Sequence, residues 1–330
     1  MGRWRACTTW FVAEQHQDFT LEAADTGTTL AAALRRRLPG TSWSDVRALC
    51  ATGKVRLDGE RAIDPAARVR AGQQVQLRPN APRPTTAPPG FKVVFDDAHL
   101  VVIEKPSGIS SVPYERKETG TAMDLIRAAW KRAGRRATAT PLYVVHRIDK
   151  DTSGLLCFAK TRLAERALHT TFQRHEADRA YLALAEGNVA AQRIESHLVA
   201  DRGDGIRGST RHAGQGQRAI TFVEPVARYP RGGTARATLC RVRLETGRTH
   251  QIRIHLSERG HPLVGETVYV RDLLRAGRQP MEAARLMLHA ALLGLAHPVT
   301  GEKLEFLAPP PEDFMVELER VGGVRDDARV

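Results

Sequence analysis

The segment 142–160 constrains the fold of this chain more than any other stretch. It reads L-Y-V-V-H-R-I-D-K-D-T-S-G-L-L-C-F-A-K, in which two apolar runs, Leu142–Val145 and Leu155–Ala159, flank a polar turn. Short apolar runs bounded by turn residues are typical of buried strands. We therefore predict two strands that present a reactive loop between them.

Asp149 is the candidate catalytic residue of this loop. It lies two residues after Arg147, at the end of the first apolar stretch. Cationic partners hold a carboxylate in its ionised form. Because an ionised carboxylate can act as a nucleophile or as a base, the loop carries the chemistry of an active site.

Four blocks of the sequence, in the same chain order, resemble the signatures of the RluA-type RNA pseudouridine synthases. The block 146–161 is similar to the family's H-R-L-D-x-x-T-S-G-L-L-x-F-A-K-T. The block 93–113 resembles the strand that opens the family's catalytic domain, 244–269 resembles its second signature, and Leu288–Ala290 with His297–Pro298 resembles its closing one. Agreement across four ordered blocks is not expected by coincidence.

The resemblance implies an isomerase that detaches uracil from its ribose, rotates the base and rejoins it through a different ring atom. Asp149 would be the essential carboxylate, which attacks the ribose or the base, or removes a proton from the sugar. The sequence leaves these routes open. We expect no cofactor, because nothing is oxidised in this reaction and the chain has no Gly-rich phosphate loop or dinucleotide fingerprint.

The resemblance also implies roles for residues outside this loop. Tyr181 occupies the aromatic position of the family's K-x-Y and would pack on the target base, and Arg253 matches an arginine of the family's active site. A buried guanidinium needs a carboxylate partner, so we predict that Arg253 pairs with Asp149. The residues expected to contact the substrate are His146, Arg147, Thr152, Arg248, His250, Gln251 and Lys105.

Arg253 falls early in a predicted helix that has Thr249 as its N-cap and Gly260 as its stop. Shortly after this helix, Glu266 and Val270 depart from the family's usual G-D-x-x-Y-G. The departures leave the roles of these two positions open and the predicted catalytic residues unchanged.

Residues 21–78 are predicted to form a small α+β domain. Apolar residues recur at helical spacing from Leu30 to Leu38, a second helix begins at Ser42 or Ser44, and short strands follow. The arrangement resembles the S4-like RNA-binding domain, which is named after a ribosomal protein. The basic residues expected to contact phosphates, and so to position RNA without reading its sequence, are Arg35, Arg36, Arg37, Arg47 and Lys54.

The expected fold class is α/β (α+β). By resemblance to the family, residues 91–319 would form a catalytic domain with a mixed, mainly antiparallel sheet flanked by helices. Residues 1–20 are interpreted as an N-terminal extension, the proline-dense residues 79–90 as an extended linker and residues 320–330 as a charged tail. Residues 190–217 show no sustained period, which fits an RNA-facing insertion or a solvated loop.

The charge balance indicates a polyanionic partner. The chain of 330 residues has 50 Lys+Arg against 37 Asp+Glu, a formal net charge of +13, which suits RNA, DNA or an anionic membrane. No stretch approaches the roughly 20 apolar residues of a membrane-spanning helix. The four cysteines form no C-x-x-C pair, and no third ligand accompanies His250 and His255, so neither a disulfide framework nor a metal site is expected. We expect a cytoplasmic monomer that binds structured RNA.

Other functions are weighed against this one. The N-terminal domain favours 23S-type ribosomal RNA as the target, and a synthase that acts on transfer RNA stays open. A non-catalytic RNA-binding or ribosome-assembly protein would explain the charge, but not Asp149 beside Arg147 together with Tyr181 and Arg253. An aspartic protease is disfavoured, because the D-T-S-G at 151–154 departs from D-T-G and has no second copy.

Overall fold

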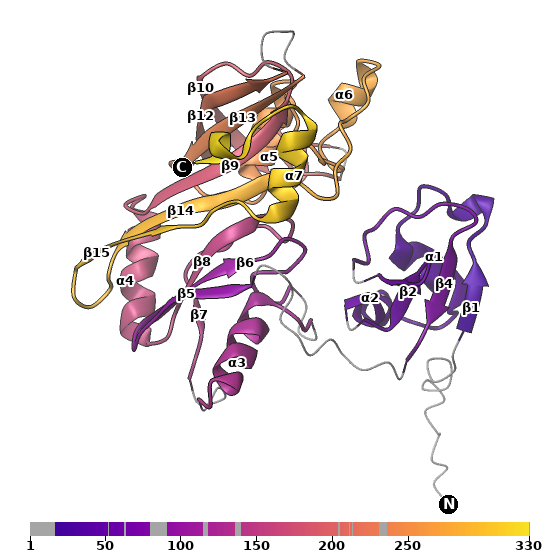
Figure 1. Cartoon of the computed structure of the whole chain (residues 1–330), viewed down its shortest axis with the longest axis horizontal. Helices are drawn as coiled ribbons and strands as arrows, with labels where there is room; N and C mark the ends of the chain where they lie inside the picture. Colours follow the sequence, from indigo (N-terminus) through magenta and orange to yellow (C-terminus); the bar gives the residue numbers. More distant parts are fainter. Residues whose placement is uncertain are drawn as a thin grey trace, which may run out of the picture. The chain divides into compact units, whose positions relative to one another are not determined.

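Figure 1 shows the computed structural model of the chain. The residues that it describes are 17–51, 53–62, 64–79, 91–114, 118–135, 140–203, 205–210, 212, 214–230 and 236–329. The chain divides into two compact units, Met1–Ala87 with Val112–Arg132 and Pro88–Ser111 with Ala133–Val330. Residues 1–16 of the expected extension and 80–90 of the expected linker lie outside the described residues.

The first unit contains a four-stranded antiparallel sheet in the order β1-β4-β2-β3. Its elements are β1 (Gln17–Thr20), η1 (Ala23–Asp25), α1 (Leu30–Arg37), α2 (Trp43–Ala51), β2 (Val55–Leu57), β3 (Glu60–Arg61), β4 (Gln74–Leu77) and α3 (Ala122–Arg132). Buried residues of the two helices, such as Leu34 and Val46, share one core with Val55 and Val75 of the strands. The predicted pair of helices followed by short strands is confirmed. The strand β1 lies within the range that the sequence analysis interpreted as an extension.

The second unit is built on a large sheet with the order β11-β10-β12-β13-β9-β14-β8-β6-β5, to which β15 and β7 are added beside β14 and β8. The strands are β5 (Lys92–Asp96), β6 (Leu100–Lys105), β7 (Tyr143–Val144), β8 (Ser153–Ala159), β9 (Asp178–Glu186), β10 (Gln192–Val199), β11 (Gly208–Thr210), β12 (Gln217–Tyr229), β13 (Ala237–Leu244), β14 (Leu288–Ala296) and β15 (Lys303–Leu307). Within the described residues, neighbouring strands are antiparallel except β8 and β14, which run parallel. The expected mixed, mainly antiparallel sheet is confirmed.

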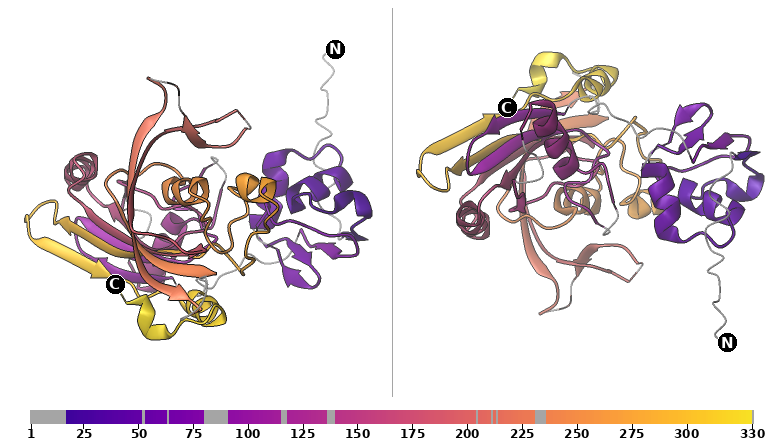
Figure 2. Two further views of the ribbon diagram at one scale, coloured as in Figure 1. Left: turned by 90° about the horizontal axis from the view of Figure 1, so that it is seen from above. Right: turned by 90° about the horizontal axis from the view of Figure 1, so that it is seen from below.

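Helices lie on both faces of this sheet, and Figure 2 shows α5 and α7 on either side of the long curved strands. The helices are α4 (Arg162–Gln173), α5 (Gln251–Glu258), α6 (Arg271–Arg275), α7 (Glu312–Arg320) and η2 (Arg325–Ala328). On β9, Leu182 and Leu184 share a core with Phe314 of α7. Because side chains alternate along a strand, Tyr181 faces the opposite side of the sheet.

The segment 190–217 is not a continuous loop, because it contributes β10 and β11 to the sheet. On β10 only Ile194 and Leu198 are buried among half-buried and exposed neighbours. Two apolar residues four positions apart are too sparse to produce a recognisable strand pattern. The strand therefore depends on its pairing with β12 rather than on its own sequence.

Glycine is required at position 154, where β8 begins beside β14. Its φ of +112° is rarely adopted by other residues, and a Cβ added there would lie 2.2 Å from the carbonyl oxygen of Ala290. This close approach allows the parallel pairing of Ser153 and Gly154 with β14. The loop that precedes β8 is thereby placed beside β14.

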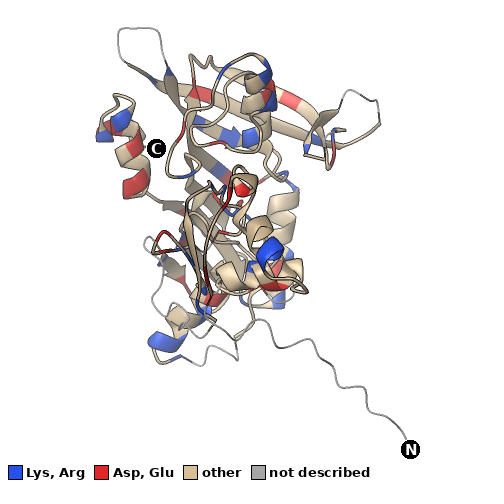
Figure 3. Cartoon of the chain, turned by 90° about the vertical axis from the view of Figure 1, so that its right-hand side faces the viewer, with Lys and Arg blue, Asp and Glu red and all other residues tan. Residues whose placement is uncertain are grey.

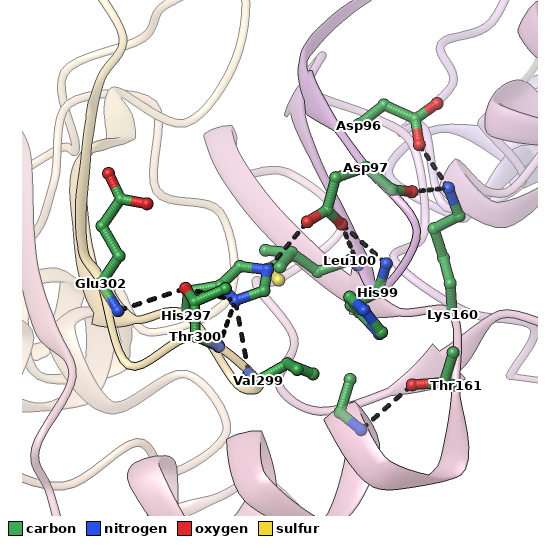
Figure 4. Close-up of polar contacts among 12 residues, drawn as sticks. Asp96, Asp97, His99, Leu100, Lys160, Thr161, His297, Val299, Thr300 and Glu302 are labelled. Carbon is green, nitrogen blue, oxygen red and sulfur yellow. Dashed lines mark hydrogen bonds and ion pairs between the residues drawn. The ribbon is translucent and has the colours of Figure 1, made fainter.

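Residues of separate signature blocks meet at one corner of the second unit, as Figure 4 shows. The Nε2 atom of His297 lies 2.8 Å from Oδ2 of Asp97, and backbone N–H groups occupy its Nδ1, so Nε2 is the donor. Lys160 donates to Oδ1 of Asp96 at 2.6 Å, and Thr161 caps α4. The contact between His297 and Asp97 joins blocks that are 200 positions apart in the chain.

Three histidines are uncharged components of this unit, of which His255 and His289 are buried and His146 is half-buried. His146 accepts a hydrogen bond from the backbone N–H of Cys157 at 2.9 Å. The ring of His255 lies between two hydroxyl groups, and that of His289 lies between the hydroxyl of Ser153 and a backbone carbonyl. Burial lowers the pKa of His146 to about 3 and the pKa values of His255 and His289 to about 4.

The free energy of unfolding is expected to fall when the pH is lowered from about 7 to about 5. In this range the three histidines stay neutral in the folded protein but bind protons once the chain unfolds, since an exposed histidine has a pKa near 6.5. Their contribution is fully present above about pH 6.5 and is lost toward their folded pKa values, by about 2 kcal/mol for each residue at pH 5. Urea unfolding at both pH values measures the loss.

The variant His289→Gln serves as the comparison, because its side chain can still hydrogen bond but does not titrate. Its unfolding free energy should fall less between the two pH values than that of the natural protein. An equal loss in both proteins would contradict the assignment for His289.

Candidate active site

The loop between β7 and β8 carries Asp149, as the sequence predicted. The two strands pair antiparallel, with Tyr143 opposite Ala159. The main chain beside Asp149 is fixed, because the hydroxyl of Ser111 donates to the carbonyl of Ile148 at 2.6 Å and accepts from its N–H at 3.3 Å. The fixed backbone limits the positions that the carboxylate can take.

Lys105 holds the part of this loop that follows Asp149. Its side chain is buried, and Nζ donates to the carbonyl oxygens of Pro106 at 2.9 Å, Ile109 at 2.7 Å and Lys150 at 2.9 Å. Burial lowers the pKa of Lys105 to about 7, against the charges of nearby aspartates that raise it. Three carbonyl acceptors match the three donors of an ammonium group, so Lys105 braces the residue that follows Asp149.

A cleft of about 490 Å³ opens beside the loop. The predicted site residues that line it are Asp149, Tyr181, His146, Arg147, Thr152, Arg248 and Gln251. Lys105, His250 and Arg253 are not among the residues that line it. The structure therefore brings together one carboxylate, one phenol and two of the predicted arginines on the surface of a single hollow.

Tyr181 reaches the cleft from β9 and is 8% exposed. Burial raises its pKa, and the charge of Asp149 raises it further, whereas Arg179 lowers it. The phenol is therefore protonated at neutral pH. It presents an aromatic ring and a hydroxyl group beside the carboxylate.

Arg253 forms a bidentate ion pair with Glu266, so the prediction that it pairs with Asp149 is wrong. Nε lies 2.8 Å from Oε2 and Nη2 lies 2.7 Å from Oε1, with both side chains almost fully buried. Burial lowers the pKa of Arg253, but the hydrogen bonds and charge of Glu266 outweigh it and raise the pKa above its ordinary value. The charge of Asp149 also raises this pKa, so Asp149 lies within electrostatic range of the guanidinium.

Glu266 has a structural role that the sequence did not predict. Besides Arg253, its Oε1 atom accepts from the backbone N–H groups of Thr267 at 3.0 Å, Val268 at 2.8 Å and Tyr269 at 3.3 Å. One carboxylate thus fixes both the guanidinium and the turn that follows. The requirement of Arg253 for a carboxylate was visible in the sequence, but the partner 13 positions along the chain was not distinguishable from Asp149.

The predicted helix after residue 249 is confirmed as α5, but its N-cap is His250 rather than Thr249. His250 has a left-handed backbone with φ of +59°, which is uncommon for a residue with a side chain. Thr249 instead accepts a hydrogen bond from Nη2 of Arg147 at 2.7 Å. The segment before α5 is therefore tied directly to the catalytic loop.

Several predicted substrate contacts have partners within the protein. Gln251 is buried and donates from Nε2 to the carbonyl of Ile220 at 2.9 Å and to the hydroxyl of Thr221 at 3.0 Å. Thr152 is buried, and the ring of His146 stacks on Phe172. Among the predicted substrate contacts, Arg147 is exposed and Arg248 is half-buried.

Arg179, two residues before Tyr181, also lines the cleft, although the sequence predicted no role for it. Its guanidinium lies 5.7 Å from the ring of Phe172. A Cβ added at Gly247 would lie 2.7 Å from its Nη1 atom, so the second signature block packs closely against it. Arg179 therefore adds a third positive charge to the lining of the cleft.

The described residues contain neither a candidate metal cluster nor a membrane-spanning helix. Among these residues, no group of three or more His, Cys, Asp or Glu side chains is placed to hold a metal ion. No helix in the part of the chain that the structure describes is long and apolar enough to span a membrane.

Comparison with known proteins defines the class of the molecule. Residues 99–258 match the family model described as RNA pseudouridylate synthase. The chain belongs to the RNA pseudouridine synthases of the RluA type, which are isomerases. This confirms the family indicated by the signature blocks.

Two curated relatives and one solved structure show the extent of the similarity. The ribosomal large subunit pseudouridine synthase D of Zymomonas mobilis is 35% identical over 266 residues, which cover 78% of this chain and 82% of the relative. The uncharacterized RNA pseudouridine synthase YhcT of Bacillus subtilis is 36% identical over 224 residues, which cover 67% of this chain and 69% of the relative. The human RNA pseudouridylate synthase domain containing 4 shares the fold, with a TM-score of 0.52 and 23% identity over 69% of this chain and 92% of that chain.

The variant Glu266→Gln is expected to lower the free energy of unfolding by about 3 kcal/mol, because it leaves the buried charge of Arg253 without a countercharge. Urea unfolding measures this loss. Glu312→Gln is the matched control, since Glu312 forms a similar bidentate pair with Arg325 on the surface and should be replaceable with little change. Equal losses of unfolding free energy in the two variants would show that the buried pair stabilises the fold no more than the surface pair does.

Proposed function

We propose that this protein converts specific uridines of structured RNA to pseudouridine, with Asp149 as the essential carboxylate. The observation that supports this role is the cleft in which Asp149 lies with Tyr181 and Arg147. Its volume of about 490 Å³ is in the range of small-molecule sites and suits a single nucleotide. A base in structured RNA must be everted to reach such a site, at a cost of a few kcal/mol.

Four of the residues that line the cleft have a task in this proposal. The ring of Tyr181 packs on the everted uracil, and Arg147 and Arg248 hold the nucleotide through its phosphates. Lys105 and Arg253 interact electrostatically with Asp149 without lining the cleft. Asp149 then attacks the ribose or the base, or removes a proton from the sugar, and the same placed carboxylate serves each route.

Large-subunit ribosomal RNA is the proposed target. Relatives named ribosomal large subunit pseudouridine synthase D include the protein of Zymomonas mobilis and that of Escherichia coli O157:H7, which is 31% identical over 93% of its length. The proposal places the protein in the cytoplasm as a monomer without cofactor or metal. Lys and Arg residues occur on both helices and strands, as Figure 3 shows, in keeping with a polyanionic substrate.

Residues 21–78 are proposed to act as an S4-like RNA-binding domain. The guanidinium of Arg35 lies 4.6 Å from the ring of Trp43, whose side chain is 42% exposed, so both present stacking surfaces. Arg36 and Arg37 pair with Asp25 at 3.0 and 3.1 Å, which offsets part of their charge. Arg35 is therefore the stronger candidate for contact with RNA among these three.

The variant Asp149→Asn is expected to abolish pseudouridine formation while leaving the thermal midpoint and RNA affinity nearly unchanged, because only the ionised carboxylate is removed. Purified protein is incubated with transcripts of large-subunit ribosomal RNA and of transfer RNA, and pseudouridine is mapped in each. Asp151→Asn, the same change two residues along the loop, should retain most of the activity. Near-normal turnover by Asp149→Asn would remove Asp149 from the mechanism.

The same assay separates the alternative functions. If pseudouridine forms only in transfer RNA, the protein is a pseudouridine synthase whose target is transfer RNA and not ribosomal RNA. Failure of the natural protein to modify any cellular RNA would favour a binding or ribosome-assembly role.

The variant Tyr181→Phe is expected to reduce kcat by about tenfold or less, since the ring that packs on the base remains and only a proton-transfer group is lost. Tyr181→Ala should be much less active because it removes the ring. Single-turnover kinetics with the modified transcript compare the two. A loss in Tyr181→Phe as complete as that of Asp149→Asn would show that the hydroxyl is required.

A further inference from the structure

A chain of polar contacts leads from Tyr269 through His250 toward Asp149. Nδ1 of His250 lies 2.7 Å from the hydroxyl oxygen of Tyr269, and Nε2 of the same ring lies 4.0 Å from Oδ1 of Asp149. The rings of His250 and Tyr269 meet edge to face, with centroids 5.6 Å apart. His250 thus stands between a phenol and the candidate catalytic carboxylate.

Tyr269 is held firmly enough to fix one end of this chain. Its side chain is 5% exposed and packs in a core cluster with Ile254 of α5. Its ring lies 5.3 Å from the guanidinium carbon of Arg253, and its backbone N–H donates to Glu266. The position of the Tyr269 hydroxyl therefore follows from the buried Arg253 and Glu266 pair.

The charges around His250 favour one protonation state. Burial lowers its pKa, as do Arg253 and Arg207, whereas Asp149 and Glu266 raise it without reversing the shift. The imidazole is therefore neutral at neutral pH and carries one hydrogen. A lone pair on Nε2 would face the negative carboxylate of Asp149, so the hydrogen belongs on Nε2 and Nδ1 is an acceptor for the Tyr269 hydroxyl.

We propose that Tyr269 and His250 are positioning residues for Asp149: the Tyr269 hydroxyl donates to Nδ1 of His250, and this bond directs the Nε2 hydrogen toward one oxygen of the Asp149 carboxylate. The proposal rests on the proposed role of Asp149 and gives His250 a task other than contact with the substrate. The separation of 4.0 Å exceeds a hydrogen bond, and hydrogen bonds in substrate-free sites commonly shorten when the substrate binds.

This contact would determine which oxygen of Asp149 faces the nucleotide. A carboxylate with one oxygen held by His250 turns its other oxygen toward the nucleotide in the cleft. His250 is the N-cap of α5 and has a left-handed backbone, which helps to set the position of its ring. Loss of the contact should slow the reaction of bound RNA and leave the binding of RNA unchanged, since neither side chain lines the cleft.

The test is a double-mutant cycle on kcat and KM. Tyr269→Phe should lower kcat about tenfold and change KM for the RNA transcript by less than about twofold. His250→Gln keeps a side-chain N–H but has no tautomers to select. In the His250→Gln background, Tyr269→Phe should therefore change kcat by less than about twofold.

Tyr229→Phe is the matched control. Tyr229 is also buried, and its hydroxyl donates to Asp327 at 2.7 Å in the core beside α7. The control removes a buried tyrosine hydroxyl without touching the cleft, so its kcat should equal that of the natural protein. Thermal unfolding of all variants shows whether any loss of activity follows a loss of fold.

Three outcomes would overturn the inference. A rise in KM with unchanged kcat in Tyr269→Phe would assign His250 to substrate binding. Additive effects in the double variant would show that Tyr269 does not act through His250. An unchanged kcat in Tyr269→Phe, together with an inactive Asp149→Asn, would refute the positioning role and leave the proposed function intact, whereas activity in Asp149→Asn would refute the function itself.

Discussion

The buried ion pair between Arg253 and Glu266 fixes the surroundings of the candidate catalytic carboxylate. A guanidinium in a dry interior is tolerated only when a carboxylate satisfies both its charge and its donors, and Glu266 does so through two hydrogen bonds. Because the same carboxylate also accepts three backbone N–H groups, it couples α5 to the turn that carries Tyr269. The pair therefore positions charge and hydroxyl groups near Asp149 without contacting it.

The backbone of the loop that carries Asp149 is itself fixed by hydrogen bonds. Lys105 and Ser111 bind carbonyl and N–H groups of Lys150 and Ile148, the two neighbours of Asp149. The side chain of Asp149 is 18% exposed, so it remains accessible although its backbone is held on both sides. A site of this kind is preorganised, since little reorganisation of the loop is needed when a nucleotide enters the cleft.

Much of the fold and the location of the site could be predicted from the sequence. The apolar runs around Asp149 predicted β7 and β8, helical spacing predicted α1, and cap and stop residues predicted α5, because these patterns are local in the sequence. The strand β10 could not be predicted, because only Ile194 and Leu198 are buried on it. Likewise the sequence predicted Thr249 as the N-cap of α5, because threonine is a preferred capping residue and histidine is not.

By itself, the sequence determined the family, the loop that carries Asp149 and the chemical types of the residues around it, because signatures record residue identity and order. The tertiary structure decided which of these residues meet. In the structure Arg253 pairs with Glu266, and Lys105 and Gln251 hydrogen bond to backbone carbonyl groups. His250 lies between Tyr269 and Asp149. Such pairings depend on distances between segments far apart in the chain, which a linear pattern of residues does not contain.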